Sequence, residues 1–357
     1  MSARWLRESK RANASQAAAA PEAAPRLTVP LGQGPALLAS LRQARRLVLP
    51  HAILVSGAHG IGKTVVMKWL TAALLCPSDL ADEGPCGVCR TCSRIAADLH
   101  PDVHVLQLAR DEDDKEANKH LKKSFYVVSI EQVRYAQEAL SRHAVEGRAR
   151  VLRVDSADCM SDEAQNALLK TLEEPGQATF LLLEAASPER LLPTVHSRVQ
   201  RLRVLPLEDS VVEREILRRS PTGSLDLPQA IGLCRGSLGL ALELGTKRMV
   251  HLHDLVLQAL DAPQGLRPID LAGEVVEGIK ERWLVQEQAR SFLWLLRAEI
   301  RRRRDALAEQ ADDSYPASTS EPWTSWLELT LAADRDLDLQ IPAEQVLAAC
   351  LLQFSGD

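Results

Sequence analysis

Three features are absent from this chain of 357 residues, and each absence excludes a class of protein. No stretch approaches the roughly 18 consecutive apolar residues that a membrane span requires. The apolar core of a secretory signal is also missing, because Pro21 and Glu22 interrupt a short alanine run near the N-terminus. Positive charge is not in excess, since 43 Lys and Arg residues face 48 Asp and Glu residues, a net charge of −5. We therefore expect neither a membrane protein, nor a secreted one, nor one that coats nucleic acid by bulk charge.

The chain does contain a globular balance of residues and an unusual group of cysteines. Hydrophobic residues make up 46% and charged residues 25%, and the length suggests two or three domains. Four of the seven cysteines fall between Cys76 and Cys92. Without an export signal the chain is expected in a reducing cytoplasm, where such a cluster indicates metal or redox chemistry rather than disulfides.

Hydrophobic patterning predicts a parallel α/β sheet within residues 27–206. Residues 1–26 are rich in Ala and Pro and are expected to be a flexible extension. Short apolar runs predict strands at 52–55, 103–108, 151–154 and 180–183, with an edge strand at 201–205. Helical spacing predicts helices at 37–44, 64–75, 130–143 and 162–173, the last one capped by Ser161 and stopped by Pro175. Strands that alternate with helices favour a parallel sheet flanked by helices.

After about residue 206 the strand signals end and helical patterns remain. We expect one helical domain at 207–247 and a second at 248–357, which a loop at 308–322 interrupts. Four of the six tryptophans lie in this last region, and side chains of that size are mostly buried in helix packing.

A phosphate-binding loop follows the first predicted strand. Residues 57–64, Gly-Ala-His-Gly-Ile-Gly-Lys-Thr, match the P-loop pattern G-x-x-x-x-G-K-[ST]. Gly57, Gly60 and Gly62 let successive backbone N–H groups turn around phosphate oxygens, and the next helix directs its positive N-terminus at the same anion. Lys63 would reach the β- and γ-phosphates, and the Thr64 hydroxyl would ligate Mg²⁺. The motif indicates binding of ATP with Mg²⁺, and a glycine-rich turn without nucleotide is the simpler alternative.

The carboxylate that holds Mg²⁺ in a P-loop enzyme ends a neighbouring strand, and Asp155 is the candidate. Ser156 follows it, at the position where many oligomeric ATPases of this architecture carry a glutamate that polarises the attacking water. Serine is a poor general base near neutral pH without a partner. We therefore expect a chain equipped to bind nucleotide but poorly equipped to hydrolyse it.

The clustered cysteines have the number and the spacing of a tetrahedral zinc site. They are Cys76, Cys86, Cys89 and Cys92. Four thiolates close the coordination shell of zinc, so the predicted ion is structural rather than catalytic. Two overlapping C-x-x-C pairs leave disulfide exchange as the alternative.

Two arginine features carry weaker signals. Arg198 follows Ser197 after a short segment beyond the strand at 180–183, where it could project toward a neighbouring subunit and stabilise transferred phosphoryl charge as an arginine finger. The run 301–304 consists of four arginines on a predicted helix. Such charges more often form a solvated face than a binding site.

These elements, in this order, resemble the clamp-loader branch of the AAA+ ATPases of bacterial replication. The resemblance rests on the P-loop, the four cysteines directly after its helix, the stretch Asn-Ala-Leu-Leu-Lys-Thr-Leu-Glu-Glu-Pro at 166–175, and Ser197-Arg198. Within this branch the chain is similar to the delta-prime subunits of DNA polymerase III rather than to the gamma/tau motor subunits. Ser156 stands in place of the motor's glutamate, Gly239 stands in place of its sensor-2 arginine, and no long tau-type tail follows.

The resemblance implies an AAA+ domain with an inserted zinc module at 76–92, a helical lid domain at 207–247 and a helical collar domain at 248–357 that mediates oligomerisation. It implies a cytoplasmic component of a DNA-directed DNA polymerase holoenzyme, a nucleotidyltransferase complex, with little ATP hydrolysis of its own. Its partners would be the gamma/tau and delta subunits, and through the complex the sliding clamp and primer-template DNA. Arg198 would complete the ATP site of the adjacent motor subunit.

Two other functions remain open on the sequence. One is a gamma/tau-like ATPase motor that uses Lys63, Thr64 and Asp155 itself. The other is a zinc-dependent nucleic-acid-binding module, which the lack of interleaved aromatic and basic residues around the cysteines disfavours.

Overall fold

The strands predicted from the sequence form one five-stranded sheet in which every neighbouring pair is parallel. In the order β2-β3-β4-β1-β5, the sheet contains β1 (Ala52–Ser56), β2 (Val103–Leu106), β3 (Arg150–Val154), β4 (Thr179–Ala185) and β5 (Gln200–Arg203). The computed structural model describes residues 27–28, 30–32, 35–78, 84–108, 127–146, 148–219, 227–261, 265, 267–280, 282–310, 321–339 and 341–354.

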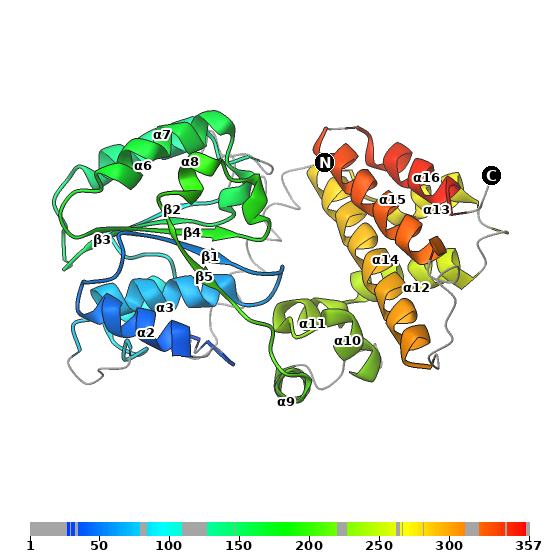
Figure 1. The fold of residues 1–357 in the computed structure, drawn as a ribbon, viewed down its shortest axis with the longest axis horizontal. Helices are drawn as coiled ribbons and strands as arrows, with labels where there is room; N and C mark the ends of the chain where they lie inside the picture. The colour runs from blue at the N-terminus through cyan, green and yellow to red at the C-terminus, as the bar shows by residue number, and fades with distance from the viewer. Residues whose placement is uncertain are drawn as a thin grey trace, which may run out of the picture.

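Helices cover both faces of the sheet (Figure 1). One face carries α2 (Pro35–Arg45), α3 (Lys63–Leu75) and α4 (Arg90–Ala96), and the other carries α6 (Ile130–Leu140), α7 (Asp162–Glu173) and α8 (Pro193–His196). Alternate strand residues divide between these layers, because successive side chains of a strand point to opposite faces. Leu182 packs toward α3, whereas Leu181 and Leu183 pack toward α6 and α7. Two short helical turns, η2 (Ala157–Cys159) and η3 (Pro188–Arg190), follow the ends of β3 and β4.

Helix α7 illustrates how local sequence sets the boundaries. The Ser161 side chain accepts a hydrogen bond from the backbone of Ala164, and Asp162 and Glu163 occupy the first turn, where negative charge is favourable. The helix ends at Glu173, two residues before Pro175. Both predicted boundaries of this helix are therefore confirmed.

The rest of the described chain is helical. Three short helices come first, namely α9 (Asp209–Arg219), α10 (Leu227–Cys234) and α11 (Leu238–Leu244). Five further helices follow, namely α12 (Lys247–Asp261), α13 (Pro268–Val276), α14 (Arg282–Gln310), α15 (Glu321–Asp338) and α16 (Ala343–Leu352). Buried side chains from Leu207 to Phe354 form one continuous cluster, in which Trp326 stacks on Phe354 with ring centroids 4.7 Å apart.

The predicted fold class is confirmed, with a parallel sheet between helical layers and helices alone after it. The expected extension at 1–26 and residues 311–320 of the expected loop lie outside the described residues. Within the described part of the chain, we find no helix with the length and apolarity that crossing a membrane would require.

Candidate functional site

The P-loop lies between β1 and α3, as its sequence predicts. β1 ends at Ser56, and Lys63 and Thr64 open α3, so the helix N-terminus faces the loop. Gly60 has φ +69°, and a Cβ added there would lie 2.7 Å from the backbone nitrogen of Leu240 and from Ser237 Oγ. Only glycine fits here, because position 60 has a left-handed backbone conformation and lies too close to α11 for a Cβ atom.

The start of α11 packs directly on the P-loop. Ser237 Oγ donates to the carbonyl oxygen of His59 at 2.9 Å, and the backbone N–H of Gly239 donates to the carbonyl oxygen of Gly60 at 2.9 Å. A Cβ at position 239 would lie 2.7 Å from Gly60 O and 2.9 Å from Gly60 Cα. The position where the motor pattern has arginine therefore has no room for a side chain in this arrangement.

An apolar pocket opens beside this contact. Its volume is about 160 Å³. The residues that line it come from the P-loop, from α3 and α11, from the segment before α2, and from α9 with the segment before it. They include Gly60, Ile61, Val65, Leu31, Leu207 and Leu242.

The polar side chains of the P-loop are engaged by the protein itself. Lys63 Nζ donates to the carbonyl oxygen of Ala58 at 3.0 Å and lies 3.8 Å from Glu184 Oε1. Thr64 Oγ1 donates to Glu184 Oε2 at 2.9 Å. Burial lowers the pKa of Lys63 and raises the pKa of Glu184. Glu184 comes from β4, whose register places it beside Val55 of β1.

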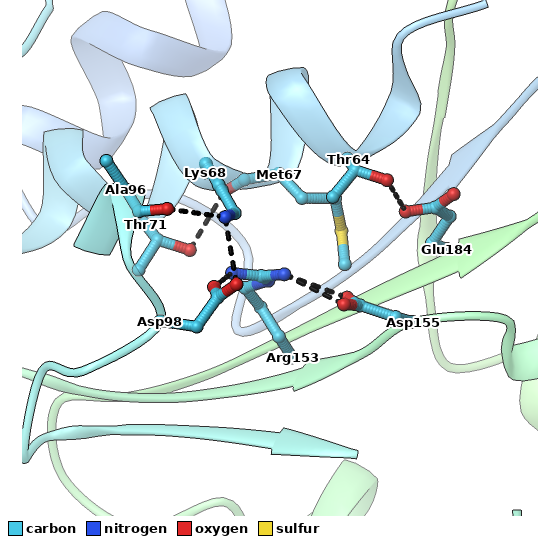
Figure 2. A network of polar contacts seen from close by, with 9 residues as sticks. All are labelled: Thr64, Met67, Lys68, Thr71, Ala96, Asp98, Arg153, Asp155 and Glu184. Atoms are coloured by element: carbon cyan, nitrogen blue, oxygen red, sulfur yellow. Dashed lines mark hydrogen bonds and ion pairs between the residues drawn. The ribbon is translucent and has the colours of Figure 1, made fainter. Parts of the chain in front are cut away.

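Asp155, the residue after β3, is also paired within the chain, with Arg153 of β3 (Figure 2). Arg153 Nη2 lies 3.1 Å and 2.8 Å from the two carboxylate oxygens of Asp155, and Arg153 Nη1 lies 2.6 Å from Asp98 Oδ1. Lys68 of α3 completes the group, with its Nζ 2.9 Å from Asp98 Oδ2 and 2.7 Å from the carbonyl oxygen of Ala96. Burial opposes the charge of Arg153, but the two carboxylates outweigh it and raise the pKa of its guanidinium.

These contacts do not fit a Mg²⁺ site. Both oxygens of Asp155 accept hydrogen bonds from one guanidinium that already balances the carboxylate charge, and the Thr64 hydroxyl donates to Glu184. Neither Arg153 nor Glu184 was predicted from the sequence as part of this site. Each interrupts an otherwise apolar strand run, and Arg153 lies two positions before Asp155, which places both side chains on the same face of the sheet.

Ser156 sits directly beyond β3 in a left-handed conformation, with φ 60° and ψ 55°. Non-glycine residues adopt this conformation rarely. The 3-10 turn that follows positions Asp158, whose Oδ2 accepts from the backbone N–H groups of Ala186 and Ser187 at 2.9 Å and 2.8 Å. Asp158 therefore fixes the segment after β4.

The four predicted metal ligands converge at the end of α3. The Sγ atoms of Cys76, Cys86, Cys89 and Cys92 all lie within 4.8 Å of one another. Three of these Sγ–Sγ distances are 3.7, 3.8 and 3.9 Å. A tetrahedral zinc ion with Zn–S bonds of about 2.3 Å requires Sγ–Sγ separations of about 3.8 Å, so the four cysteines fit zinc.

Backbone amides support these sulfurs. Cys89 N lies 3.4 Å from Cys86 Sγ and Cys92 N lies 3.5 Å from Cys89 Sγ. Although burial opposes it, hydrogen bonds from the amides of Val88 and Cys89 lower the pKa of the Cys86 thiol to about 6. Arg45 of α2 donates to the carbonyl oxygens of Cys76 and Ser78. The cluster is therefore anchored to the helices on the α3 face of the sheet.

Arg198 lies between α8 and β5, two residues after the end of α8. Its Nε donates to Glu173 Oε1 at 2.8 Å, its Nη2 pairs with the same oxygen, and its Nη1 donates to the carbonyl oxygen of Thr194 at 3.0 Å. The side chain is 34% exposed. Arg198 is thus oriented by Glu173 but still accessible from outside the domain.

The arginine run on α14 is largely paired within the chain. Glu299 is buried and accepts hydrogen bonds from Arg302 and Arg303, and Arg304 pairs with Asp305. The expected solvated face is therefore mainly an intramolecular ion-pair network.

Comparison with known proteins shows a similarity to DNA polymerase III subunits. Residues 35–208, which include the whole sheet, match the family model described as DNA polymerase III, delta subunit. The chain is 35% identical over 231 residues to DNA polymerase III subunit delta' of Pseudomonas aeruginosa, a match that covers 65% of this chain and 61% of that protein. Over this part, the chain is similar to the DNA polymerase III delta-prime family.

The chain is also similar to gamma/tau proteins. It is 31% identical over 158 residues to DNA polymerase III subunit gamma/tau of Mycobacterium bovis, covering 44% of this chain and 25% of that protein. The solved structure of a DNA polymerase III gamma subunit-related protein from Thermotoga maritima covers 89% of this chain and 99% of its own, with 17% identity and a TM-score of 0.46. The chain spans less than two thirds of the length of the curated relatives it matches.

Proposed function

We propose that this chain acts as a delta-prime-type subunit of the DNA polymerase III clamp loader, which helps an ATP-driven ring to load the sliding clamp onto primed DNA. The observation that carries the proposal is the presentation of Arg198. Glu173 and the carbonyl oxygen of Thr194 orient its guanidinium, and about a third of the side chain remains exposed. An arginine held in this way can act on a ligand outside its own domain.

Arg198 is proposed to reach the ATP of a neighbouring motor subunit. A guanidinium placed against a transferring phosphoryl group stabilises the charge that develops on it. The pair with Glu173 is partly solvated, and surface ion pairs contribute only about 0–1 kcal/mol. Exchange of the Glu173 carboxylate for a phosphate oxygen would therefore cost little.

The chain's own site supports a subunit with little or no ATP hydrolysis. Ser156 supplies no carboxylate to polarise a water molecule, and the motor's sensor-2 arginine is replaced by Gly239 in contact with the P-loop. The same features argue against the alternative, an active gamma/tau-like ATPase motor.

The proposed partners are the gamma/tau and delta subunits, with the sliding clamp and primer-template DNA reached through the complex. Residues 207–247 would form the lid and residues 248–357 the collar that holds the ring together. We place the protein in the cytoplasm with the replication machinery, as a component of the DNA-directed DNA polymerase holoenzyme rather than as an independent ATPase. The four cysteines are proposed to bind a structural zinc ion that fixes the end of α3 to α4.

ATP turnover distinguishes the proposal from the alternative. The purified chain, its Lys63→Ala variant, and the complexes of each with gamma/tau and delta would be assayed at equal concentration. We expect negligible turnover by the chain alone and similar turnover by the two complexes. Robust turnover by the isolated chain that Lys63→Ala abolishes would contradict the proposal and establish the motor.

A further inference from the structure

Two residues of the central strands near the P-loop have charged side chains. These are positions that an α/β sheet ordinarily fills with apolar or small side chains. Arg153 and Glu184 belong to the central strands β3 and β4, and both face α3 (Figure 2). The strand register pairs Val154 with Leu183, so the next residues, Asp155 and Glu184, lie side by side at the carboxyl edge of the sheet. Ligands of open α/β sheets bind at this edge.

Glu184 contacts the two P-loop side chains that recognise phosphate in this motif. One carboxylate oxygen accepts a hydrogen bond from Thr64 Oγ1 at 2.9 Å, and the other lies 3.8 Å from Lys63 Nζ. Lys63 is almost fully buried, with 5% of its side chain exposed. A buried ammonium group requires a partner, because an unpaired buried charge is strongly unfavourable. Glu184 supplies that partner without a nucleotide.

Arg153 performs the corresponding role for the acidic residues. Its side chain is completely buried, and it bridges Asp155 and Asp98, while Lys68 makes the second contact to Asp98. Two cations and two carboxylates therefore balance each other between α3 and the sheet. A divalent cation at Asp155 would have to displace a guanidinium that makes two hydrogen bonds to that carboxylate.

We propose that this P-loop is closed from within: Glu184 takes the place of a phosphate anion on Lys63 and Thr64, and Arg153 takes the place of the divalent cation on Asp155. The motif is then a structural element that keeps the start of α3 and the carboxyl edge of the sheet together. This inference concerns the isolated chain and does not depend on the clamp-loader function proposed above.

The first test measures nucleotide binding to the purified chain. Fluorescent mant-ATP is titrated with Mg²⁺ and with EDTA against the wild type, Glu184→Gln and a control, Glu138→Gln, which changes an exposed carboxylate on α6 at the opposite face of the sheet. Glutamine keeps the size of glutamate and removes its charge. Because a like charge close to phosphate is repulsive, we expect Glu184→Gln to bind at least about tenfold more tightly than the wild type, and Glu138→Gln to be unchanged.

Two results would overturn this half of the proposal. If Glu184→Gln binds no more tightly than the wild type, the carboxylate does not exclude the phosphate. If the wild type binds in a Mg²⁺-dependent manner and Glu184→Gln weakens that binding, Glu184 is part of a metal site.

The second test measures thermal unfolding without nucleotide. If Asp155 were a metal ligand in a metal-free site, neutralising it would relieve repulsion between carboxylates and stabilise the fold. If Asp155 is the partner of the buried Arg153, neutralising it is destabilising. We expect Asp155→Asn to lower the midpoint by roughly 5 °C or more and the exposed control Asp336→Asn to leave it unchanged, with no effect of Mg²⁺ on the wild type. A midpoint that rises in Asp155→Asn, or that rises with Mg²⁺ in the wild type, would show that Asp155 is a metal ligand.

Discussion

The contact between α11 and the P-loop predicts that Gly239→Ala destabilises the protein, whereas a glycine-to-alanine substitution in a helix without such a contact stabilises it. In Gly239→Ala the new Cβ would lie 2.7 Å from Gly60 O, closer than a Cβ atom approaches a backbone oxygen in proteins. Overpacking of this kind costs about 1–3 kcal/mol, and displacement of α11 would also weaken two hydrogen bonds that contribute about 0.5–1.5 kcal/mol each. The higher helix propensity of alanine offsets at most about 1 kcal/mol of this loss in the free energy of unfolding. We therefore expect a net loss of about 1–3 kcal/mol.

Gly273→Ala is the matched control. Gly273 lies inside α13, and the nearest atom to its added Cβ is Glu344 Oε1 at 3.8 Å, an ordinary contact distance. This substitution should stabilise the protein by about 0.5–1 kcal/mol, because alanine is the better helix former. Urea unfolding followed by circular dichroism measures both changes. Equal stabilisation by the two substitutions would refute the packing of α11 on the P-loop.

Three other predictions concern the metal site, the ion pairs of α14 and the aromatic core. Cys89→Ser should reduce bound zinc in a colorimetric assay and lower the thermal midpoint, whereas Cys159→Ser should retain zinc. Burial raises the pKa of Glu299, but hydrogen bonds from two arginines of α14 outweigh burial and lower that pKa. Glu299→Gln should therefore be less stable than the wild type above the ordinary pKa of 4.5, and the difference should vanish as the pH falls through the lowered value. Phe354→Ala removes the stacking partner of Trp326 and should lower the free energy of unfolding by about 3 kcal/mol, measurable by urea titration.

Much of the fold could be predicted because its determinants are local. Short, mainly apolar runs of four to six residues indicate strands, and the structure has a strand at each of them. The capping of α7 by Ser161 depends on residues within one helical turn. The cysteine cluster has the spacing of a known coordination chemistry, so its convergence could also be anticipated.

The internal pairing of the P-loop could not be predicted in this way. Arg153 was included in the predicted strand at 151–154 because its neighbours are apolar, and Glu184 lies one residue beyond the predicted strand at 180–183. Strand periodicity alone does not show which partners face these two side chains. The partners of Arg153 include Asp98, which is 55 positions away, and Thr64 meets Glu184 across 120 positions. These contacts depend on how α3 and α4 pack on the sheet. The approach of Gly239 to Gly60 depends on tertiary packing in the same manner.

The central claim is that Arg198 acts on the ATP of a neighbouring subunit. The measurement is ATP turnover by the complex of this chain with gamma/tau, delta, the sliding clamp and primed DNA, assembled with Arg198→Ala or with Arg134→Ala. Arg134 is an exposed arginine on α6, so its variant controls for the loss of a surface charge. We expect Arg134→Ala to match the wild type and Arg198→Ala to slow turnover while the complex still assembles. An unchanged rate in the assembled Arg198→Ala complex would contradict the account.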